Sequence, residues 1–69
     1  MDLRERQLLP RRFEILQIIR DHKQVSLSFI KRRFFAVPER TLRYDLEQLA
    51  KKGFVIKRGE TKGAVYEVK

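Results

Sequence analysis

Four side chains that hydrogen-bond readily to phosphates or to base edges lie within five consecutive residues: Arg40, Thr41, Arg43 and Tyr44. A guanidinium can donate twice to guanine or clamp a phosphate. A threonine hydroxyl and a phenol donate to phosphate oxygens, and the threonine methyl can contact thymine. The residue types do not separate base reading from backbone contact. The pattern predicts a nucleic-acid-binding surface.

The distribution of charge supports the same chemistry. The chain has 69 residues with 17 Lys and Arg against nine acids, which gives a net charge of +8. Ten basic and four acidic residues fall between positions 31 and 62, so six of the eight net charges lie in less than half of the chain. A charge concentrated in this way is typical of a phosphate-binding surface, although a basic run such as Lys31-Arg32-Arg33 often serves only solubility. We expect Lys31 and Arg32 to contact phosphate.

Other kinds of site have little support in the sequence. The chain has no cysteine, which excludes a disulfide or a Cys-based zinc site. We expect the single histidine, His22, to be a surface or capping residue, and Asp45 to pair with a nearby arginine rather than to act in catalysis. With no phosphate-binding glycine loop and no nucleophile beside a base, we expect no enzymatic activity, no cofactor and no metal.

A helix over residues 38–52 must position the four polar side chains. Its apolar stripe consists of Leu42, Leu46, Leu49 and Ala50. Pro38 and Glu39 suit a first turn, and Gly53 suits the left-handed position after the last turn. With the stripe buried, we expect Arg40, Thr41, Tyr44 and Gln48 to face outward, with Arg43 flanking them.

Two helices are expected before it. The first starts at Pro10, after a flexible leader over residues 1–9, and its apolar face consists of Phe13, Ile15, Leu16, Ile18 and Ile19. The second follows a short extended segment at Val25, has Ser26 as its N-cap, and buries Phe29, Ile30 and Phe34. Residues 35–37 form the turn to the third helix. We expect the phenylalanines at helical spacing to be core residues rather than stacking platforms, with Phe35 the least certain.

After Gly53 the pattern changes to that of strands. Residues 54–58 and 64–68 are rich in β-branched and aromatic side chains, and the loop at 59–63 is polar and flanked by glycines. This predicts a β-hairpin. We expect its basic segment, residues 57–63, to form a wing that lies along the neighbouring DNA backbone or in the minor groove, with Arg58 and Lys62 among its contacts. The fold is then α+β, a winged helix-turn-helix over residues 10–69 with the order α-β-α-α-β-β and a C-terminal hairpin wing.

The chain resembles the winged-helix module of DeoR-type bacterial regulators. That family shows a pattern of the form v-S-x-R-T-[IL]-R-R-D-L-x-x-L-x-x-x-G-x-[IL] before a basic wing. Arg40-Thr41-Leu42-Arg43 occupies its R-T-[IL]-R and Asp45-Leu46 its D-L. Pro38 replaces the usual serine cap and Tyr44 replaces the second arginine. The resemblance implies binding of double-stranded DNA, usually in transcriptional regulation.

A second resemblance leaves an alternative open. The chain is also similar to the winged helix at the C-terminal end of many Fic-domain proteins, where LRERQL (residues 3–8) resembles the segment before the first helix. The domain would then be a protein-interaction module of a larger enzyme; RNA binding is a third possibility. The sequence stops directly after the wing, so we expect either a small stand-alone regulator or a module of a larger polypeptide. Besides DNA, the expected partners are a second copy in a homodimer or that parent polypeptide. With no membrane span and no export signal, we expect it in the cytoplasm, associated with the nucleoid.

Overall fold

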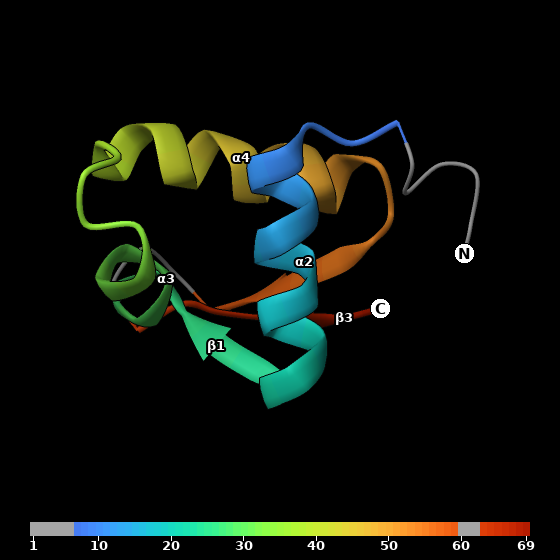
Figure 1. Cartoon of the computed structure of the whole chain (residues 1–69). Coiled ribbons are helices and arrows are strands. Elements are labelled where there is room, and N and C mark those ends of the chain that lie inside the picture. Colours follow the sequence, from blue (N-terminus) through green and yellow to red (C-terminus); the bar gives the residue numbers. More distant parts are fainter. Residues whose placement is uncertain (1–6, 60–62) are drawn as a thin grey trace.

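Over residues 7–59 and 63–69, which the computed structural model describes, the chain forms three helices and a three-stranded antiparallel sheet (Figure 1). In chain order the elements are α2 (Pro10–His22), β1 (Gln24–Ser26), α3 (Leu27–Arg33), α4 (Glu39–Lys51), β2 (Val55–Arg58) and β3 (Val65–Val68). The α+β class and the order of elements predicted from the sequence are confirmed. In the part of the chain described, no helix is long and apolar enough to cross a membrane.

Helix α2 begins at Pro10, as predicted, because the first turn of a helix does not need the missing N–H of proline. Ile15, Leu16 and Ile19 are fully buried on its inner face. His22 closes the helix, with its Nδ1 2.9 Å from the carbonyl oxygen of Ile18. This agrees with the capping role expected for this histidine.

The serine cap of α3 is also where the sequence predicts it. Ser26 Oγ accepts a hydrogen bond of 3.2 Å from the backbone N–H of Phe29. Ile30 is fully buried beneath the helix, while Phe29 and Phe34 pack partly buried against the core. A five-residue connection, residues 34–38, then leads to α4, and together α3 and α4 form the helix-turn-helix.

Helix α4 buries Leu42, Leu46 and Leu49 completely. The helix begins at Glu39, one residue later than the sequence predicts. Pro38 lies just before it in an extended conformation, and its carbonyl oxygen accepts a hydrogen bond of 3.0 Å from the N–H of Thr41. At the other end Gly53 has φ 86°, as predicted for the residue that ends the helix. The N–H of Phe54 returns to the carbonyl of Leu49, which completes a Schellman motif.

The predicted hairpin is present as β2 and β3, although residues 60–62 of its loop lie outside the described residues. The strand order is β1-β3-β2, so the short strand before α3 also joins the sheet. Val25 of β1 and Lys57 of β2 both lie opposite Tyr66 of β3. The pairing of β1 with β3 ties the beginning of the helix-turn-helix to the hairpin.

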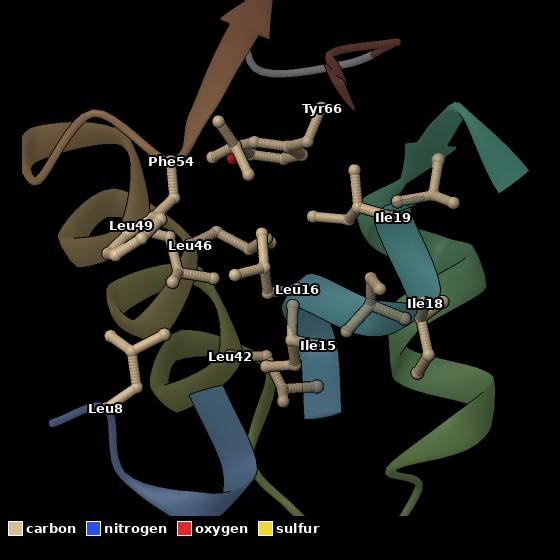
Figure 2. Close-up of a cluster of buried hydrophobic side chains, with 13 residues drawn as sticks. Leu8, Ile15, Leu16, Ile18, Ile19, Leu42, Leu46, Leu49, Phe54 and Tyr66 are labelled. Carbon is tan, nitrogen blue, oxygen red and sulfur yellow. The ribbon is translucent and has the colours of Figure 1, made fainter. Parts of the chain in front are cut away.

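One core lies between α2, α4 and the sheet (Figure 2). The buried leucines of α4 face Ile15 and Leu16 of α2, and Tyr66 covers the side toward the sheet. Leu8 belongs to this core with 8% exposure, so the leader boundary set at residue 9 leaves out a core residue. Leu8 and Leu9 are adjacent apolar residues before Pro10, and no periodicity indicates which of the two faces the core.

The phenylalanines at helical spacing, Phe13, Phe29 and Phe34, pack partly buried against the core, as predicted. The prediction is wrong for Phe35, which is 81% exposed. The residue after the end of α3, Phe34, turns toward the core. Its neighbour Phe35 therefore lies on the outside of the turn. Sequence spacing alone does not indicate which of these two adjacent phenylalanines faces the core.

Candidate nucleic-acid interface

The face of α4 opposite the core carries polar side chains. Arg40, Arg43 and Tyr44 are exposed and Thr41 is half-buried, in the arrangement that the buried stripe predicts. Gln48, one turn after Tyr44, is half-buried. The expected contact residues of the third helix are therefore brought together on one side of the molecule, with Tyr44 54% exposed.

Few internal contacts restrain the two arginines of this face. Among the described contacts, Arg43 has one ion pair: its Nη2 lies 3.8 Å from Glu39 Oε1, one helical turn away, and both side chains are about half exposed. Exposed pairs of this kind contribute about 0–1 kcal/mol, so the pair can exchange for a phosphate at little cost. Glu39 also lies in the first turn of α4, where a negative charge is favourable to the helix dipole.

Asp45 lies on the buried side of the same helix and has no exposed surface. Its carboxylate accepts hydrogen bonds from Arg11 Nε at 2.5 Å and Nη2 at 3.3 Å, and from Arg12 Nε at 2.9 Å. Burial alone would raise the pKa of Asp45, but the hydrogen bonds from the two arginines outweigh it and hold the pKa below its usual value. The hydrogen bond between Arg11 and Asp45 in turn raises the pKa of Arg11. Asp45 is thus a structural ion-pair residue, as expected from the sequence.

Arg12 makes a second contact with α4. Its guanidinium carbon lies 5.4 Å from the centre of the Tyr44 ring, within the range of a cation–π interaction. Arg12 and Arg11 both belong to the first turn of α2, more than 30 residues from their partners on α4. The start of α2 is therefore held against the middle of the exposed helix.

The basic residues of α3 have different surroundings. Lys31 Nζ donates to the carbonyl oxygens of Phe35 at 2.9 Å and Val37 at 2.7 Å, so it stabilises the turn between the helices. The Arg33 guanidinium lies 5.8 Å from the Phe29 ring. Arg32 is exposed. Of the two α3 residues predicted to contact phosphate, Arg32 presents its charge to solvent, whereas Lys31 shares its charge with the turn.

The described part of the wing carries Lys57 and Arg58, both exposed. Arg58 Nε donates to Glu67 Oε1 of β3 at 2.5 Å, and the arginine side chain stays 61% exposed. Lys62, also predicted to bind DNA, lies outside the described residues. The loop leaves the sheet at Gly59 (φ 94°) and returns at Gly63 (φ 82°), and both glycines adopt the left-handed conformation that favours this residue.

A hollow of about 510 Å³ is lined by residues of α3, of α4 and of the described part of the wing. Ser28 at the start of α3, Arg43 of α4 and Gly63 of the wing are among its lining residues. The three elements that the sequence assigns to DNA contact therefore meet around one open space. The described residues contain no group of three His, Cys, Asp or Glu side chains that could hold a metal ion.

Residues 11–65, well over half of the chain, match the DeoR-like helix-turn-helix domain. This chain belongs to the DeoR-like helix-turn-helix family. No curated protein matches it significantly. Membership supports DNA as the partner and transcriptional regulation as the setting, and the family is one of DNA-binding rather than enzymatic domains.

The DeoR-like pattern divides between the two sides of α4. Arg40 and Arg43 occupy exposed positions, whereas Asp45 and Leu46 of the D-L pair are fully buried. Tyr44, which stands where the pattern has a second arginine, is also exposed. The departure from the pattern at Tyr44 therefore lies on the outer surface of this DeoR-like domain and not in its core.

Sequence reasoning missed Arg11 and Arg12. The apolar pattern of the first helix gives these two residues no role. The available signal was weak: one aspartate lies among the apolar residues of α4, and two adjacent arginines follow Pro10. A buried carboxylate needs charged partners, but the sequence does not say which of 17 basic residues supply them.

Proposed function

We propose that this DeoR-like domain binds double-stranded DNA in a sequence-dependent manner, with α4 in the major groove and the wing on the adjacent backbone. The observation that carries the proposal is the exposed face of α4, where Arg40, Arg43 and Tyr44 project from a helix whose opposite side is locked into the core. The major groove is about 12 Å wide and accepts one helix of this kind. A domain with this activity acts at the nucleoid, most simply as a transcriptional regulator.

The residues divide into two expected roles. Arg40 and Thr41 lie in the first turn of α4, the part of a recognition helix that reaches base edges. Arg32, Arg58 and Lys62 are expected to contact the DNA backbone. Such contacts set the affinity and its salt dependence but carry no sequence information. Arg43 borders the hollow between helix and wing and is placed to hold the phosphate strand that passes there.

The test begins with selection of duplexes from a random library by the purified domain. Affinity for the selected duplex is then titrated at several salt concentrations for the wild type, Arg40→Ala, Arg43→Ala and Lys62→Ala. Lys69→Ala removes the same charge at the end of β3 opposite to the wing and serves as the control. Each of the three test variants is expected to weaken binding, and Lys62→Ala is expected to reduce the slope of log affinity against log salt by about 1.

Base reading and backbone contact give different patterns across sequences. Arg40→Ala is expected to cost about 1–3 kcal/mol on the selected duplex and less on an unrelated one, whereas Lys62→Ala weakens both equally. Absence of duplex binding by the wild type even at about 50 mM salt would favour the alternative, a protein-interaction module of a larger polypeptide. Equal affinity for an RNA duplex of the same sequence would favour the third possibility.

A further inference from the structure

Arg12 is the residue that joins the buried and exposed sides of α4. Its side chain is only 14% exposed, its Nε donates to Asp45 Oδ1 at 2.9 Å, and its guanidinium lies against the ring of Tyr44. Asp45 and Tyr44 are neighbours in sequence, so their side chains leave the helix about 100° apart. One guanidinium from α2 therefore contacts both a buried side chain of α4, Asp45, and an exposed one, Tyr44.

The anchor of this arrangement is rigid. Asp45 is fully buried and is held a second time by the two hydrogen bonds from Arg11. The Nε–H of Arg12 therefore donates to a buried acceptor that two further hydrogen bonds hold. Tyr44 is 54% exposed and, without a neighbour, would distribute between the staggered rotamers open to a helical tyrosine.

We propose that Arg12 is a positioning residue for DNA recognition: it holds the Tyr44 ring in one orientation on the surface of α4. The inference rests on the proposed function, since it assumes that Tyr44 meets DNA. An ordered ring loses less conformational entropy when the duplex binds. The position that departs from the DeoR-like pattern is thus matched by a support on α2, and the preference of the domain depends on a residue outside the helix-turn-helix.

The first experiment tests the contact in the free protein by NMR. The side-chain protons of Arg12 are expected to show an upfield ring-current shift that disappears in Tyr44→Ala. The χ1 couplings of Tyr44 are expected to indicate one rotamer in the wild type and averaging in Arg12→Lys, which keeps the charge but not the planar fork. Unshifted Arg12 protons in the wild type, or equal averaging in both proteins, overturn the proposal.

The second experiment is a double-mutant cycle on the selected duplex. Arg12→Lys is expected to weaken binding about two- to fivefold when Tyr44 is present, and to have no effect in the Tyr44→Ala background. Arg33→Lys provides the matched control, because Arg33 also lies over an aromatic ring, that of Phe29. Its effect is expected to be the same with and without Tyr44.

The outcomes separate the two proposals. Tight duplex binding with additive effects of Arg12→Lys and Tyr44→Ala overturns the positioning role and leaves the proposed function intact. If the wild type binds no duplex although the Arg12 protons show the expected upfield shift, the proposed function is overturned instead. If Arg12→Lys is unfolded, the wild type alone decides: χ1 couplings that indicate one rotamer of Tyr44 support the positioning role, and couplings that indicate averaging overturn it.

Discussion

Asp45 shows how one buried charge can organise two helices. A carboxylate without exposed surface is tolerated because Arg11 and Arg12 supply three hydrogen bonds to it. Two positive charges face one negative charge, so the cluster keeps an excess of one positive charge near the exposed face of α4. At the scale of the residue, the contacts that stabilise Asp45 therefore also support the face of α4 that we propose to bind DNA.

Replacing Asp45 by Asn is expected to lower the free energy of unfolding by about 3 kcal/mol at pH 7, measured by urea denaturation. This is the low end for a broken buried pair, because the side chain of Arg11 is 37% exposed and can regain water. Glu47→Gln, at an exposed position of the same helix, is the control and is expected to change little.

The same substitution also changes the pH dependence of stability. The pKa of Asp45 is lowered in the folded state, so its contribution is complete above the unfolded pKa of about 3.9 and is lost as the pH falls through the folded pKa. Below about pH 3.9 the wild type is therefore expected to lose stability more steeply than Asp45→Asn, by up to about 1.4 kcal/mol per pH unit. Parallel curves for the two proteins would show that the ion pairs do not stabilise the fold.

Phe35→Ser gives a prediction of the opposite kind. Because the Phe35 ring is 81% exposed, its loss is expected to change the free energy of unfolding by no more than about 0.5 kcal/mol. Leu46→Ala, in the fully buried core, is expected to cost about 2–5 kcal/mol in the same urea experiment. A large loss for Phe35→Ser would place its side chain in the core after all.

At the scale of the elements, local signals determine most boundaries. Pro10, Ser26 and Gly53 each mark a helix end through backbone chemistry that acts within a few residues, and all three were recognised in the sequence. The apolar stripe of α4 likewise predicts which of its side chains face outward. Contacts between distant segments were not predictable in this way: the pairing of β1 with β3 and the partners of Asp45 depend on how the elements pack.

The end of α4 offers a test of such a local signal. Gly53 has φ 86°, and a side chain in this conformation is strained although no atom lies within 4 Å of the position of its Cβ. Gly53→Ala is expected to destabilise the domain by about 1–2 kcal/mol in thermal or urea unfolding. Gly53→Asn is expected to cost less, since asparagine adopts this conformation more readily.

At the scale of the whole molecule, one domain of this size covers only a few base pairs, so useful specificity calls for two linked modules. We expect the selected duplexes to contain paired half-sites with a fixed spacing of about one helical turn if the protein acts as a homodimer. Analytical ultracentrifugation of the complex gives the stoichiometry. Single half-sites bound by one copy would instead favour a module whose second contact comes from a larger parent polypeptide.

Ser26 has two structural roles, and together they have a consequence for how DNA is met. It pairs with Val65 of β3 as the last residue of β1, and its hydroxyl caps α3. The sheet register therefore sets the distance between the helix pair and the hairpin. This register cannot shift by one residue without turning the core side chains to the outside. Calorimetry of binding should accordingly show a heat-capacity change accounted for by the contact area alone, with no contribution from folding.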